Sequence, residues 1–270
     1  MAAATSIDGY LDAHHLDNCV NLVGKLAIVL SILEAESSGV DGKLGSGARS
    51  ATPDLKAFGG TWLPRFFKLL SANIPREDIN SIFDRAAVVS FNYDRSFECF
   101  LTIFIQSFYA VSSQEAEDVM RKLTIIHPYG TVGPWFSSNR HPFGMNVAVP
   151  DRLLNLAQGI RTYTESSAEV MTLQELVRRA EVIVFLGFRY ISDNMALLGP
   201  VDGRLCRRIF GTAAGRSNSD KAMIDAQLAG FLAPKTGYYM PDHKTARIDL
   251  FSGTCSDLFD NFPLAMTAAV

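Results

Sequence analysis

Two segments of the chain pass abruptly from an apolar run to polar or glycine residues. The first is VVSFNYD at 88–94, and the second is VIVFLGF at 182–188. Strands of a parallel sheet are covered on both faces, so they read as continuous Val, Ile, Leu and Phe, and ligand contacts lie just beyond their carboxyl ends. The two segments therefore predict a parallel α/β sheet and locate a candidate binding site at its carboxyl edge.

Helical and strand-like patterns alternate along the rest of the chain. Strands are predicted at 86–91, 123–127, 182–187, 209–212 and 246–251. Helices are predicted at 16–36, 61–72, 95–110, 113–122, 153–160, 173–180, 217–231 and 256–266. This order is typical of an α/β fold with a parallel sheet and right-handed crossovers, flanked by helices. We expect one domain over 1–270, with a mostly helical part at 1–85, a flexible loop at 37–54 and the sheet part at 86–270.

Composition narrows the classes of partner. A formal charge of -3 over 270 residues gives no general attraction to a polyanion, so we expect no direct nucleic-acid binding. The apolar stretches 20–33 and 97–111 are shorter than the ~20 residues that span a bilayer, and both contain charged residues. We therefore predict that both are core helices and that the protein has no membrane partner.

The cysteines argue against a metal site. Cys19, Cys99, Cys206 and Cys255 are far apart and form no CxxC pair, so neither a zinc site nor a redox dithiol is expected. Buried free thiols and a reducing, cytoplasmic location fit this pattern better.

Polar residues at the first two strand ends are candidates for chemistry. Asn92 can donate and accept hydrogen bonds to a ligand, although turn formation explains it equally well. Asp94 can contact a ligand or cap the next helix, which is the commoner role of an aspartate in this position. His127 follows the strand at 123–127 and is a candidate acid or base near neutral pH, with purely structural hydrogen bonding as the alternative.

The later strand ends carry glycines. Gly187 lets the backbone turn sharply and approach a ligand closely, because glycine has no Cβ. Gly211 and Thr212 repeat this pattern more weakly at the end of another predicted strand.

Four blocks of the sequence together resemble the SIR2-like (sirtuin-like) domain family of bacterial proteins. They are SFNYDRSFE at 90–98, IIHPYGTVG at 125–133, VIVFLGFRYISDN at 182–194 and RIFGTAAG at 208–215. The resemblance covers roughly residues 86–215 and rests on the order and spacing of the blocks. It implies a Rossmann-like sheet that binds NAD, and many bacterial members are NAD-degrading effectors of antiphage defence.

The resemblance also implies roles for single residues. Asn92 and Asp94 match the family's Asn-Tyr-Asp block, in which the asparagine lies beside the nicotinamide ribose and helps to position water. Gly187 and Phe188 match the late strand end that lines the adenosine side of the pocket. Tyr129 and Gly130 align with the family's His-Gly pair.

Two departures from the family pattern affect these expectations. Tyr129 stands where the family has its catalytic base, whereas His127 lies two residues earlier and would point the same way on an extended strand. No apolar strand with a Gly-Ala-Gly-x-Ser loop, which holds the NAD phosphates in the family, is written before residues 6–11. We therefore expect a sheet that is incomplete at its N-terminus. Zinc-ribbon cysteines are absent too, which argues against a deacylase.

The leading hypothesis is an NAD hydrolase that cleaves the nicotinamide N-glycosidic bond, with Asn92 and either His127 or Tyr129 as catalytic residues. Asp94, Gly130, Gly187, Phe188, Gly211 and Thr212 are the expected nucleotide contacts. The partner would be a small-molecule nucleotide, NAD, with no metal, and homo-oligomerisation stays open. The alternative is a non-catalytic nucleotide-sensing or protein-interaction module that keeps the fold without the chemistry.

Overall fold

All five predicted strands are present, and all of them pair in parallel. They are β1 (Ala87–Val89), β2 (Thr124–Ile126), β3 (Val182–Phe185), β4 (Arg208–Thr212) and β5 (Arg247–Phe251). The structure is a computed structural model. It describes residues 7–38, 55–136, 141–145, 147, 149–163, 165, 170–201, 205–232 and 246–267. The predicted flexible loop at 37–54 lies almost entirely outside the described residues.

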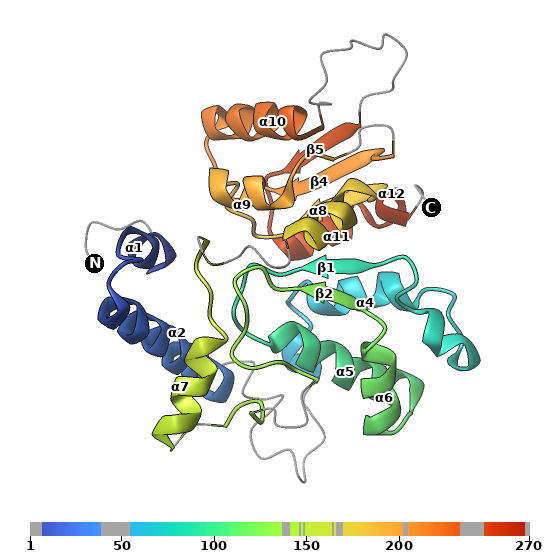
Figure 1. The fold of residues 1–270 in the computed structure, drawn as a ribbon. Coiled ribbons are helices and arrows are strands. Elements are labelled where there is room, and N and C mark those ends of the chain that lie inside the picture. The colour runs from blue at the N-terminus through green and yellow to red at the C-terminus, as the bar shows by residue number, and fades with distance from the viewer. Residues whose placement is uncertain are drawn as a thin grey trace. The chain divides into compact units, whose positions relative to one another are not determined.

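The protein is an α/β protein with two small parallel sheets (Figure 1). β1 pairs with β2, with Val88 opposite Ile125, and the other sheet has the order β3-β4-β5. Contacts within the chain define two compact units: Met1–Gly59 with Leu70–Ser167, and Gly60–Leu69 with Ala168–Val270. We call them the first and the second unit. Each contains one of the two sheets.

The first unit is mostly helical around β1 and β2. Its helices are α1 (Ile7–Ala13), α2 (Asn18–Ser38), η1 (Leu55–Phe58), η2 (Arg76–Ser81), α5 (Ser96–Tyr109), α6 (Ser113–Met120) and α7 (Pro150–Gln158). α2 packs against α1 and α7, and α5 packs against α6. Phe100, Leu101 and Ile105 of α5 are completely buried, so this helix forms the centre of the unit's core, as its apolar sequence predicts.

α2 has both a buried and an exposed apolar face. Val29 and Leu33 are buried, whereas Val23 and Leu30 are exposed, so the prediction of a core helix holds for one side only. The helix is long and apolar enough to cross a membrane by length and composition, a test that core helices and signal sequences also pass. Its residue Glu36 is buried in an ion pair within the first unit.

α6 begins with a capping box. The Ser112 hydroxyl accepts a hydrogen bond from the backbone N–H of Glu115, and the Glu115 carboxylate accepts one from the backbone N–H of Ser112. Two backbone donors that the helix leaves unpaired are satisfied in this way.

We expect Ser112→Ala to lower the free energy of unfolding by about 1 kcal/mol, the usual cost of losing such a cap. Urea denaturation followed by circular dichroism measures this change. Ser112→Asp keeps an accepting oxygen at the cap, so a loss as large as that of the alanine variant would show that the capping bond is not responsible.

The second unit places helices around β3, β4 and β5. Its helices are α8 (Val170–Arg178), α9 (Ser192–Leu198), α10 (Asn218–Leu232), α11 (Cys255–Asn261) and α12 (Pro263–Thr267), together with residues 63–69 of α4 (Leu63–Ser71). Its core gathers Phe210, Leu258, Phe259 and Met266. A single helix was predicted at 256–266, but Pro263 opens a new helix there because proline has no N–H to continue the old one.

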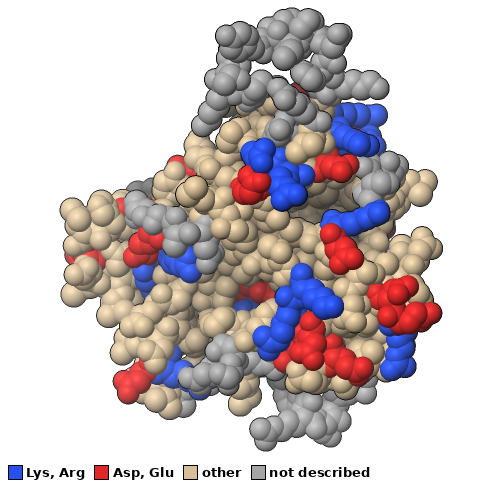
Figure 2. All heavy atoms as spheres, turned by 45° about the vertical axis from the view of Figure 1, so that its right-hand side comes forward, with Lys and Arg blue, Asp and Glu red and all other residues tan. Residues whose placement is uncertain are grey.

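Charged side chains of both signs are interspersed on the face drawn in Figure 2. Among the described pairs, Arg65 and Asp260 bind each other at 2.7 Å, and Arg178 and Glu175 do so at 2.8 Å. Such exposed pairs contribute little to stability individually.

Candidate functional site

The predicted site residues fall into two groups, one in each unit. Those at the ends of β1 and β2 belong to the first unit, and those at the ends of β3 and β4 belong to the second. The first group is Asn92, Asp94, His127, Tyr129 and Gly130, and the second group is Gly187, Phe188, Gly211 and Thr212.

The loop after β1 carries Asn92 on the surface. The backbone N–H of Ser90 still donates to the carbonyl of Ile126 at 2.9 Å, and then the chain leaves the ladder. The Ser90 hydroxyl accepts from the backbone N–H of Asn92 at 3.3 Å, and Asn92 itself is exposed. Asp94 accepts from the backbone N–H of Ser96, the first residue of α5, at 3.0 Å, while the N-cap residue of this helix is Arg95, whose side chain makes no capping bond.

His127 lies beside this loop and has a partner at each ring nitrogen. Nδ1 is 3.1 Å from the backbone carbonyl oxygen of Asn92, and Nε2 is 2.9 Å from Oε1 of Glu98. The histidine side chain is 11% exposed and that of Glu98 is 5% exposed, so the pair is largely removed from water. Two residues predicted from different strand ends, His127 after β2 and Asn92 after β1, are thus in contact through the Asn92 backbone.

The protonation of this pair follows from its partners. Burial lowers the pKa of His127, but the hydrogen bond and charge of Glu98, the Asn92 carbonyl and the charge of Asp94 together raise it above 6.5. A neutral ring has one N–H, whereas two acceptors face it here. The ring donates to both acceptors only when it carries a proton on each nitrogen.

Tyr129 and Gly130 follow in a turn, not on an extended strand. The backbone N–H of Gly130 donates to the His127 carbonyl at 2.9 Å, so the strand alternation expected for positions 127 and 129 does not apply. The Tyr129 ring is buried and packs edge-on against Phe91 at 5.7 Å. Its backbone carbonyl accepts from the N–H of Arg161 at 2.8 Å.

Gly130 has a structural reason to be glycine. Its φ is +75°, and a Cβ there would lie 1.9 Å from the carbonyl oxygen of Gly159. The two strands of backbone meet at the antiparallel bridge between Gly130 and Ile160. The close approach of the backbone thus excludes a side chain at this position, whether or not a ligand binds here.

The second group of residues is tied together by Thr212. The Thr212 hydroxyl accepts from the backbone N–H of Gly187 at 2.8 Å and donates to the Phe185 carbonyl at 3.4 Å. Gly187 is exposed with φ +59°, and a Cβ there would meet nothing closer than Cys255 Sγ at 4.0 Å. Among the described residues, no packed side chain therefore fills the space beside Gly187.

Gly211 and Phe188 face an aromatic residue of the same unit. A Cβ on Gly211 would lie 2.2 Å from the hydroxyl oxygen of Tyr190, so this glycine makes room for a buried tyrosine. Phe188 packs edge-on against the Tyr190 ring at 5.3 Å. Burial raises the pKa of Tyr190, which keeps its hydroxyl protonated.

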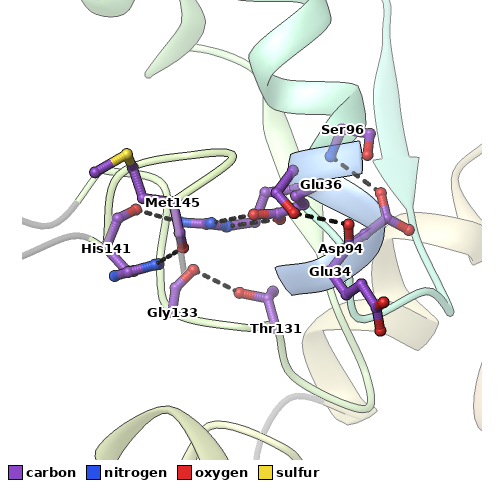
Figure 3. Close-up of polar contacts among 10 residues, drawn as sticks. Glu34, Glu36, Asp94, Ser96, Thr131, Gly133, His141 and Met145 are labelled. Atoms are coloured by element: carbon purple, nitrogen blue, oxygen red, sulfur yellow. Dashed lines mark hydrogen bonds and ion pairs between the residues drawn. The ribbon is translucent and has the colours of Figure 1, made fainter. Parts of the chain in front are cut away.

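A buried ion pair joins Glu36 of α2 to Arg95, the residue before α5, and Figure 3 draws the polar contacts around Glu36 and His141. Arg95 donates to Glu36 through Nη2 at 2.6 Å and Nε at 3.2 Å, and through Nη1 to the His141 carbonyl at 2.6 Å. Arg95 is 0% exposed and Glu36 is 1% exposed. Burial raises the pKa of Glu36, although Arg95 and the backbone N–H of Gly144 act against this shift.

Sequence reasoning missed this cluster and the role of Glu98. His141 is buried in this cluster, and its Nε2 lies against the Met145 carbonyl. Burial lowers the pKa of His141, so the ring is held neutral. The available signal was the charge of Arg95 and Glu98 at the edge of an apolar helix, since such charges are rarely buried unless paired.

The cysteines are unpaired, but they differ in exposure. All four are free; Cys99 and Cys206 are buried as predicted, whereas Cys19 is exposed and Cys255 is half-buried. Within the described ranges, no three His, Cys, Asp or Glu side chains are placed to hold a metal ion. A surface hollow of about 430 Å³ lies at the turn between α1 and α2, lined by residues 13–19, none of which was predicted as a site residue.

Comparison with known proteins identifies no relative. No family model, no curated protein and no solved structure matches the chain.

Proposed function

We propose that the protein is a SIR2-like NAD-binding protein that hydrolyses the nicotinamide N-glycosidic bond. One observation carries the proposal: exposed Asn92 and largely buried His127 are joined by a hydrogen bond at the carboxyl edge of the parallel pair β1–β2. The resemblance, which rests on sequence blocks alone, assigns catalysis to this strand edge. A Rossmann-like arrangement of the strands, which is finer than the observed pair of small parallel sheets, is part of the same proposal.

The reaction breaks the bond between C1′ of the ribose and the pyridinium nitrogen, and a water oxygen adds to C1′. Nicotinamide leaves as a neutral molecule, and the water releases one proton. The amide of Asn92 would orient the water or the ribose hydroxyls, which is catalysis by positioning. His127 is the first candidate for proton transfer. Tyr129 is the second candidate, and it ranks lower because its ring is buried against Phe91 and Tyr93.

In the second unit, the exposed backbone at Gly187 and the ring of Phe188 are the proposed contacts for a nucleotide. Gly211 and Thr212 act on this region indirectly. Gly211 leaves room for Tyr190, and the Thr212 hydroxyl accepts a hydrogen bond from the backbone N–H of Gly187. Antiphage defence is proposed on the resemblance alone, a cytoplasmic location is proposed from the four free cysteines, and homo-oligomerisation stays open.

The rival function is a nucleotide-sensing or protein-interaction module without catalysis. It is favoured by the occupied ring nitrogens of His127 and the buried side chain of Tyr129, because neither group offers a free base to a substrate.

Incubation of the purified full chain with NAD, followed by chromatographic detection of nicotinamide, tests the enzyme proposal. We expect Asn92→Ala to lose roughly 100-fold in turnover, the usual loss when a positioning hydrogen bond is removed. Asn155→Ala is the matched control, since Asn155 is an exposed asparagine on α7 and should retain turnover.

Absence of nicotinamide release from the unaltered protein would remove the enzyme proposal. Calorimetric titration with NAD and ADP-ribose then decides the rival, because a sensor binds at least one of them without turnover. Binding of neither would remove the nucleotide from both functions.

A further inference from the structure

We propose that Glu98 and His127 are a positioning pair that aims Asn92, in which Glu98 holds the ring at Nε2 and the Nδ1–H of the ring holds the Asn92 carbonyl. The inference rests on the proposed function, since it takes the Asn92 amide as the catalytic group. In this inference His127 does not transfer a proton, and its role is to hold the Asn92 backbone by a hydrogen bond.

Geometry is the first support for this pair. The distances of 2.9 Å from Nε2 to Glu98 Oε1 and 3.1 Å from Nδ1 to the Asn92 oxygen are both those of ordinary hydrogen bonds. A base must present a bare nitrogen to the proton it accepts. Nδ1 instead faces a carbonyl oxygen, which has only lone pairs to offer, so it must carry its proton to make this contact.

The burial of Glu98 is the second support. Glu98 is 3% exposed, and its Oε2 has no hydrogen-bond partner among the described residues. A buried carboxylate is costly unless a cation or proton compensates it, and His127 is the group that reaches it. Glu98 therefore favours the ring that carries protons on both nitrogens, in the same direction as the raised pKa of His127. The charges that act on this ring are those of Glu98 on α5 and Asp94 in the loop before it.

The chain fixes both ends of the arrangement. Thr102 donates its hydroxyl to the backbone carbonyl of Glu98 at 2.7 Å within α5, and β2 places His127 directly after its last residue. The backbone carbonyl of Asn92 is thus held between a strand end and a helix, while its side chain remains on the surface. The backbone from which the Asn92 side chain projects is thereby fixed at its carbonyl.

Nuclear magnetic resonance of the ¹⁵N-histidine-labelled full chain tests the pair without any activity. We expect the His127 ring to titrate at a higher pH than an unperturbed histidine, and Glu98→Gln to move its titration to lower pH. The neutral ring of the variant should keep its proton on Nδ1. A His127 ring whose titration is insensitive to E98Q, or whose neutral form has a bare Nδ1, would overturn the proposal.

Two substitutions of His127 separate positioning from proton transfer in the NAD assay. The amide nitrogen of His127→Asn overlays Nδ1 and can still donate to Asn92, whereas that of His127→Gln overlays Nε2 and cannot. Neither amide can serve as a base. We expect H127N to remain within roughly tenfold of the unaltered turnover and H127Q to fall by roughly 100-fold, the cost of a misplaced catalytic group.

Equal losses in both variants would show that His127 transfers a proton and would contradict the positioning role. The resonance measurement keeps the two proposals distinguishable. If the unaltered protein releases no nicotinamide but its His127 ring titrates at a higher pH than an unperturbed histidine and responds to E98Q, the NAD hydrolase fails while the Glu98–His127 pair stands as a structural one.

Discussion

Arg95→Ala is expected to lower the free energy of unfolding by about 3–5 kcal/mol, because it leaves the buried carboxylate of Glu36 without its cation. It also removes the donor to the His141 carbonyl, which lies 2.6 Å from Nη1. Urea denaturation of the full chain measures the loss. The effect is large because Arg95 and Glu36 are 0% and 1% exposed, so water cannot replace the lost partner.

Two comparisons make this expectation specific. The double variant Glu36→Leu with Arg95→Met removes both charges and should be less destabilising than either single change, since apolar residues of similar size often replace a buried ion pair without loss. Asp118→Asn weakens the exposed pair with Arg121 in the same unit and should cost no more than about 0.5 kcal/mol. If R95A costs as little as D118N, the buried pair does not stabilise the fold.

Gly130→Ala is expected to destabilise the protein by about 3 kcal/mol or more, since a positive φ and a backbone clash each cost roughly 1–3 kcal/mol. The new Cβ would lie 1.9 Å from the Gly159 carbonyl oxygen, which is backbone and cannot rotate away. Thermal and urea denaturation measure the loss. A variant of unchanged stability would mean that the bridge between Gly130 and Ile160 is not held in this form.

The reverse exchange at Ala110 is the matched control. Ala110 ends α5 with φ 50° and ψ 48°, the left-handed conformation that favours glycine at a helix end. Ala110→Gly should raise the free energy of unfolding by about 1 kcal/mol. Opposite signs at two positions of the same unit would tie both effects to backbone conformation.

The strands were predicted well because each is a short, continuous apolar run bounded by polar residues. β3 and β5 lie within one or two residues of the predicted limits. The division of the strands into two sheets was not predicted, since hydrogen-bonding partners are not written in any local pattern. α1 and η2 were missed as well, because short helices at the surface carry little periodic signal.

The site was predictable only in part, for a related reason. Asn92 and His127 stood out because each follows a strand end, and parallel neighbours bring such ends together. Glu98 and Glu36 could not be assigned partners, since their contacts join residues 29 and 59 positions apart. Gly130 and Gly211 as ligand contacts stay predictions, and the structure gives a second reason for glycine at both positions, because protein atoms lie where a side chain would be.

The bond from Gly187 to Thr212 limits what the edge of β3 can recognise. The amide of Gly187 is already used within the protein, so it offers no donor to an incoming anion such as a phosphate. A molecule that settles there gains from flat contact with exposed backbone and with the ring of Phe188. An anion at this edge would therefore need a donor other than the Gly187 amide.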